Sequence, residues 1–123
     1  MYDGTALHRV VKGFMVQGGF LPSRNRGLDE RQEAFVQNLA PEFNDTPHDK
    51  GVLSMARLAD PGSANTSFFI VTARTPALDR VYSAFGRVVE GIDVVERIEN
   101  TPVTGEAPVT RVEVTKVTLT KLP

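Results

Sequence analysis

The 123-residue sequence has no cysteine, no tryptophan and only two histidines. Without cysteine there can be no disulfides, no thiolate nucleophile and none of the common zinc frameworks. No apolar run approaches the roughly 20 residues of a membrane helix, and the start lacks the charged-then-apolar pattern of a secretion signal. We therefore expect a soluble chain that has no membrane partner and works in the cytoplasm.

The sequence also lacks an excess of charge of either sign. Fourteen lysines and arginines face fifteen aspartates and glutamates, which gives a net charge of -1. Such a balance excludes bulk attraction to nucleic acid, so any partner must be recognised by local shape. The length suits one domain, 41% of the residues are apolar, and neither a repeat nor a linker divides the chain. The sequence predicts a single domain over residues 1–123.

Short strands dominate the patterns that are present. Branched and aromatic residues bounded by turn residues predict strands over residues 7–11, 14–17, 51–56, 67–72 and 84–88. Lys12 and Gly13 separate the first two, which predicts a tight hairpin. Residues 20–50 are expected to be mostly loop with one helical turn. In the tail, Val112 and Val114 alternate in one phase and Val117 and Leu119 in the other, which predicts a strand bulged near Thr115.

One helix is expected. Apolar and charged residues separate onto two faces at helical spacing over residues 92–99, and the apolar face should cover an open end of the sheet. Several short strands with one clear helix favour a mainly β, closed or nearly closed antiparallel barrel, with an open sandwich as the alternative.

Arg9 is the first candidate for chemistry, because it interrupts an apolar strand. A guanidinium is permanently charged and carries five donors, so it must reach either solvent or acceptors. An exposed, salt-bridged arginine on an edge strand is the plain alternative. The barrel should bring apolar residues near it, which periodicity alone would assign to the core: Phe14, Met15, Phe68, Phe69, Leu78 and Phe85. Since Phe68 and Phe69 are adjacent in a strand, they should point to opposite faces.

Three segments carry a family resemblance. In order along the chain, YDGTALHRVVKGFMVQGG, GVLSMARLADPGSANTSFFIVTA and ALDRVYSAFGRVVEGIDVVERI resemble the signature segments of the cyclophilin family of peptidyl-prolyl cis-trans isomerases. The wording Ser-Met-Ala-Arg is most similar to bacterial members. The resemblance implies a cyclophilin-like antiparallel barrel, an enzyme that isomerises X-Pro bonds, proline-containing peptides and folding proteins as partners, and a monomer.

The resemblance also implies roles for individual residues. It makes Arg9 the catalytic arginine and puts Phe14, Met15, Phe69 and Leu78 in the proline pocket. The rest of the groove would be lined by Gln17, Ala56, Arg57, Ser67 and Tyr82. His8 has a structural place in the family, no cofactor is implied, and His48 has no partner at metal-ligand spacing, so we predict no metal site.

The chain departs from the family's usual pattern in four ways. Ser67 stands where many members have glutamine, so we expect weaker binding of the residues before the proline. Ala77 stands where some have tryptophan, so we expect poor binding of cyclosporin-type macrocycles. Tyr82 stands where histidine is frequent and keeps an aromatic wall. Members usually begin with two strands and a helix ahead of Tyr-Asp-Gly-Thr, which predicts a barrel incomplete at its N-terminus. We expect weak or absent isomerase activity from these 123 residues alone and normal activity once such elements are restored. The alternatives are a non-catalytic proline-binding module and an inactive fragment.

Overall fold

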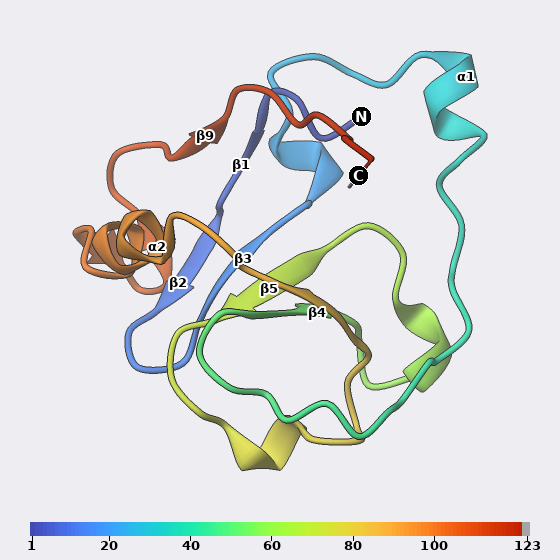
Figure 1. Ribbon diagram of the computed structural model, residues 1–123. Coiled ribbons are helices and arrows are strands. Elements are labelled where there is room, and N and C mark those ends of the chain that lie inside the picture. The colour runs from blue at the N-terminus through green and yellow to red at the C-terminus, as the bar shows by residue number, and fades with distance from the viewer. Residues whose placement is uncertain (122–123) are drawn as a thin grey trace.

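The computed structural model describes residues 1–121, and its main feature is a five-stranded antiparallel sheet (Figure 1). The strand order is β2-β3-β5-β4-β6. The bounds are β2 (Arg9–Val11), β3 (Met15–Gly18), β4 (Val52–Met55), β5 (Phe68–Val71) and β6 (Ala84–Arg87). All five lie within the segments predicted as strands or one residue beyond them.

The β2–β3 hairpin forms as predicted. The Phe14 amide donates to the Val11 carbonyl over 3.0 Å, which closes a tight turn around Lys12 and Gly13. Gly13 has a φ of +76°, a conformation that costs a side-chain-bearing residue about 1 kcal/mol or more. The glycine therefore allows the chain to reverse within four residues.

The sheet has two different faces, because side chains alternate along each strand. One face packs Leu7, Val10 and Val16 with Val95 and partly buried Ile70. The opposite face packs a second cluster, formed by Met15, Val52, Phe69 and Val71 with partly buried Phe14, Leu78 and Tyr82. Adjacent residues such as Met15 and Val16 thus serve separate clusters, and the candidate active site lies on the second face.

Helix α2 (Ile92–Glu99) has the predicted bounds and covers the first face. It contacts β2 and β3 (Figure 1). Its buried Val95 joins the cluster there. Gly91, with a φ of +85°, precedes the helix and lets the chain turn into it. The helix therefore supports the strand that carries Arg9 from behind.

Several short elements complete the fold. They are β1 (Thr5–Ala6), which pairs with β9 (Glu113–Val114), β7 (Val103–Thr104), which pairs with β8 (Ala107–Pro108), the 3₁₀ turns Leu21–Ser23, Pro61–Ser63 and Pro76–Leu78, and helix α1 (Glu30–Glu33). Helix α1 is the helical turn expected in the long loop, and an Asp29–Gln32 capping box begins it. Within residues 1–121, neither α-helix has the length and apolar character needed to cross a bilayer.

The predicted bulged strand in the tail is wrong. Strand β9 ends at Val114, and Val112 and Val114 pack on the first face. Val117 and Leu119 are half-exposed and almost fully exposed. The phase change near Thr115 is therefore the end of the strand, because residues 116–121 pair with no strand and have no buried face to alternate against.

The sheet does not close on itself. Strands β2 and β6 are its two edges and are not paired with each other within the described part of the chain. The two other sheets there have only two strands each, too few for an open sandwich. The prediction of a mainly β fold with an incomplete barrel and one clear helix is confirmed.

Candidate active site

The register of the sheet aligns the main candidates in one row across four strands. Arg9 on β2 lies opposite Gln17 on β3, Gln17 lies opposite Phe69 on β5, and Phe69 lies opposite Ser54 on β4. Directly opposed residues share a face of the sheet. A cation, an amide and an aromatic ring are therefore held side by side by backbone pairing alone.

A cavity of about 130 Å³ opens over this row. Drug-sized ligands occupy pockets of roughly 300–1,000 Å³, so this volume suits a single side chain or a small ring. The lining comprises nine of the ten site residues predicted from the sequence: Arg9, Phe14, Met15, Gln17, Ala56, Arg57, Phe69, Leu78 and Tyr82. The tenth, Ser67, lies elsewhere.

Arg9 is both an exposed, salt-bridged arginine and a neighbour of the cavity, so the two alternatives from the sequence hold together. Its side chain is 41% exposed on an edge strand, where its Nε donates to Glu106 Oε2 over 2.9 Å. Its Nη1 donates to Gln17 Oε1 over 3.2 Å on the cavity side. A guanidinium has five N–H donors, so three of them have no protein acceptor within residues 1–121. Arg9 is salt-bridged and still presents unused donors beside a cavity that apolar side chains line in part.

The walls of the cavity are well fixed. Met15 and Phe69 are 1% and 4% exposed, and the Phe69 ring meets Tyr82 edge to face at 5.8 Å. The Arg57 guanidinium lies 4.5 Å from the centre of the Tyr82 ring, and its Nη2 donates to the Val81 carbonyl over 2.7 Å. Because these contacts restrain the side chains before any ligand arrives, the cavity has a set shape.

Ser67 lines a second, larger cavity of about 350 Å³. This cavity shares Gln17, Ala56 and Arg57 with the first, so the two form a continuous groove. His8 lines it as well, with its ring 4.9 Å from that of Phe20, and burial lowers the pKa of His8. Ser67 thus lines the groove outside the first cavity, whereas Gln17 and Arg57 lie where the two cavities meet.

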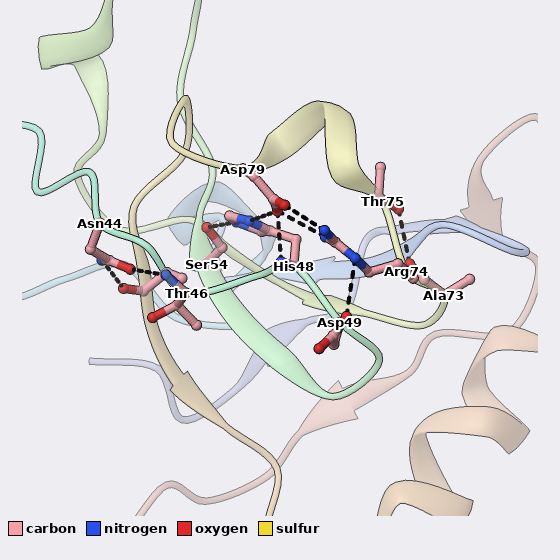
Figure 2. A network of polar contacts seen from close by, with 10 residues as sticks. Asn44, Thr46, His48, Asp49, Ser54, Ala73, Arg74, Thr75 and Asp79 are labelled. Carbon is pink, nitrogen blue, oxygen red and sulfur yellow. Dashed lines mark hydrogen bonds and ion pairs between the residues drawn. The ribbon is translucent and has the colours of Figure 1, made fainter.

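A buried polar network centres on His48 (Figure 2), whose ring stacks on Phe69. His48 is fully buried, its Nδ1 lies 3.1 Å from Asp79 Oδ1, and its Nε2 lies 2.9 Å from Ser54 Oγ. Since a carboxylate only accepts, Nδ1 carries a hydrogen, and in the neutral ring Nε2 is then the acceptor for the Ser54 hydroxyl. The hydrogen bonds from Arg74 hold the pKa of Asp79 well below its usual range.

Serine, histidine and aspartate at hydrogen-bond spacing are also the groups of a hydrolytic triad. Here Ser54 and His48 are both 0% exposed, so no substrate can reach the hydroxyl. The ring of His48 instead stacks on Phe69 at 6.2 Å, and Asp79 directly follows the 3₁₀ turn that carries Leu78. The network therefore braces two walls of the first cavity.

Phe68 packs against Tyr2 while Phe69 lines the cavity, which agrees with the expectation that the two point to opposite faces of β5. The expectation that the fold gathers Phe85 with the other apolar residues near Arg9 is wrong, because Phe85 is 58% exposed on β6. Sequence reasoning missed Glu106, because a single acidic residue 97 positions from Arg9 carries no local signal. Within the described part of the chain, no group of acidic, histidine or cysteine side chains is suited to a metal ion.

Comparisons with known proteins agree with this geometry. The family model for cyclophilin type peptidyl-prolyl cis-trans isomerase/CLD matches residues 1–119. A peptidyl-prolyl cis-trans isomerase-like 1 of Neurospora crassa is 39% identical over 117 residues, which cover 94% of this chain and 70% of that protein. A peptidyl-prolyl cis-trans isomerase of Acinetobacter baylyi is 38% identical over 106 residues, covering 82% of this chain and 54% of that protein.

The fold has a solved counterpart. A cyclophilin type peptidyl-prolyl cis-trans isomerase of Cryptosporidium parvum, crystallised in the presence of the dipeptide Ala-Pro, superposes with a TM-score of 0.82 at 25% identity, over 98% of this chain and 77% of that one. The chain spans about half the length of several bacterial relatives, 54% in one case and 53% in another. A match over nearly the whole chain, with relatives and a solved fold in agreement, shows that this chain belongs to the cyclophilin-type peptidyl-prolyl cis-trans isomerase family.

Proposed function

We propose that this chain catalyses cis-trans isomerisation of X-Pro peptide bonds. The observation that carries the proposal is the position of Arg9, which lines a cavity of about 130 Å³ beside several apolar side chains, while three of its donors have no protein acceptor within residues 1–121. The substrates are peptides and folding proteins with an exposed proline.

The reaction breaks no covalent bond. Rotation about the X-Pro amide costs about 18 to 20 kcal/mol, because the twisted bond loses its resonance. At the midpoint the prolyl nitrogen becomes pyramidal and has a lone pair that neither planar isomer presents. A guanidinium N–H from Arg9 donates to that lone pair and so favours the transition state over both ground states.

The cavity supplies the second part of the mechanism. Phe14, Met15, Phe69 and Leu78 hold the proline ring by apolar contact, and Phe69 is the most restrained of the aromatic walls. Fixing one side of the bond lets the other side rotate without dragging the ring with it. A charge-assisted hydrogen bond contributes roughly 1.5 to 3 kcal/mol, so Arg9 provides about 10- to 100-fold and the restrained ring provides the remainder.

The test is a protease-coupled isomerisation assay on a short Xaa-Pro peptide. We expect Arg9→Ala to lower kcat/KM by roughly 10- to 100-fold, and Arg9→Lys to recover little, because an ammonium has no planar fork. Arg87→Ala, which removes an exposed arginine from β6, is the matched control and should leave the rate unchanged.

The outcomes separate isomerase from binder. Peptide binding with no rate above the uncatalysed reaction, in wild type and in Arg9→Ala alike, would identify a non-catalytic proline-binding module. An equal rate loss in Arg87→Ala and Arg9→Ala would refute the role of Arg9. From the sequence, we further propose that the chain acts as a monomer, which analytical ultracentrifugation can measure. We also propose that it acts in the cytoplasm.

A further inference from the structure

Glu106 is tied to the strand of Arg9 at two points. Its backbone carbonyl accepts from the Val10 amide over 2.7 Å, and its Oε2 accepts from Arg9 Nε over 2.9 Å. The backbone hydrogen bond holds the main chain of Glu106 beside β2, so its carboxylate stays within reach of Arg9. Glu106 does not line either cavity of the groove, and a ligand held there would not touch it.

The two protein contacts of Arg9 hold opposite edges of the guanidinium. Gln17 takes one Nη1 hydrogen at 3.2 Å on the cavity side, and Glu106 takes the Nε hydrogen at 2.9 Å. With one hydrogen bond the guanidinium can still turn about its bond to Cδ, whereas two hydrogen bonds at different nitrogens, together with that bond, fix its plane. With Nε occupied by Glu106, the donors left over are all on the terminal nitrogens.

We propose that Glu106 is a positioning residue that orients the Arg9 guanidinium toward the proline-binding cavity. This inference rests on the proposed isomerase function. The carboxylate never meets the substrate, and it acts only through the arginine. Because the two side chains are 41% and 51% exposed, the ion pair is screened by solvent, and its loss should cost about two- to fivefold in kcat.

The experiment measures kcat and KM separately for Glu106→Ala and Glu106→Gln, together with thermal unfolding. We expect Glu106→Ala to lower kcat about two- to fivefold with KM almost unchanged, since the apolar walls that hold the ring are intact. Glu106→Gln keeps an acceptor for Nε and should recover most of the rate. Glu113→Gln is the matched control, because Glu113 Oε1 also accepts from an arginine Nε, that of Arg111 at 3.2 Å, outside the groove.

A double-mutant cycle provides the readout that a merely structural role would not move. If Glu106 acts through Arg9, then Glu106→Ala should have no further effect on the residual rate of Arg9→Ala. The same rate loss in both backgrounds would overturn the proposal, as would a wild-type kcat in Glu106→Ala or an equal loss in Glu113→Gln. An active wild type that depends on Arg9 but not on Glu106 refutes this inference alone. A wild type that stays inactive even after the family's N-terminal strands and helix have been added refutes the proposed function as well.

Discussion

Replacing Ser54 by alanine tests whether the buried network behind the cavity is stabilising. The Ser54 hydroxyl donates to His48 Nε2 over 2.9 Å, and both side chains are 0% exposed. In Ser54→Ala, Nε2 stays buried with no donor, and water cannot replace the hydroxyl without opening the cluster around Phe69.

The size of the effect follows from that burial. Leaving a buried acceptor unsatisfied costs about 1–3 kcal/mol, which exceeds the roughly 1 kcal/mol net value of an ordinary hydrogen bond. A domain of this size has a free energy of unfolding of about 5–15 kcal/mol. With a urea m-value of about 1–3 kcal/mol per molar, the unfolding midpoint of Ser54→Ala should fall by roughly 1 M.

Thr72 offers a matched control for this measurement. It is also a buried hydroxyl residue, 6% exposed, but its Oγ1 has no hydrogen-bond partner within residues 1–121. Thr72→Val keeps the shape and removes a polar atom that satisfies nothing, so its free energy of unfolding should be unchanged or higher. If Ser54→Ala loses less than about 0.5 kcal/mol, or if Thr72→Val loses as much as Ser54→Ala, the reasoning about the network is refuted.

Three further predictions concern other parts of the site and its frame. Phe69→Leu should raise KM for a proline peptide and lower the free energy of unfolding by about 1–2 kcal/mol, because it leaves a void between His48 and the cavity. Gly19→Ala should destabilise by about 2 kcal/mol or more, because Gly19 has a φ of +76° and a Cβ there would lie 2.4 Å from the Thr66 carbonyl oxygen. The stability advantage of wild type over Asp79→Asn should shrink as the pH falls from about 5 to 2, because a carboxylate with a lowered pKa stabilises the fold only while it is ionised.

Controls for these variants come from the chain itself. Phe85→Leu changes a phenylalanine that is 58% exposed and should affect neither KM nor stability. Gly13→Ala meets the same φ of +76° with no atom within 4 Å, so it should lose only the conformational part, about 1 kcal/mol. Equal losses in Gly13→Ala and Gly19→Ala would contradict the steric argument, and a constant gap between wild type and Asp79→Asn across that pH range would contradict the linkage argument.

Local patterns were sufficient for the hairpin and the helix. The Lys12–Gly13 turn and the two-faced spacing of residues 92–99 are encoded within a few residues, and the structure confirms both. The local pattern was not sufficient for the tail. Alternation over residues 112–119 predicted a bulged strand, but it does not reveal whether a partner strand lies beside those residues. Strand β9 ends at Val114, where its pairing with β1 ends.

The mainly β fold followed from local strand patterns, and the residues around the cavity followed from the family resemblance that the three motif segments carry. Contacts across the folded chain were needed to show that Glu106 holds Arg9 from 97 residues away and that His48 braces Phe69. Dihedral preferences and side-chain alternation depend on nearest neighbours, so they reveal local elements but not such contacts. Contacts between distant segments depend on strand register and on how loops pack across the sheet, which no short window of the sequence contains.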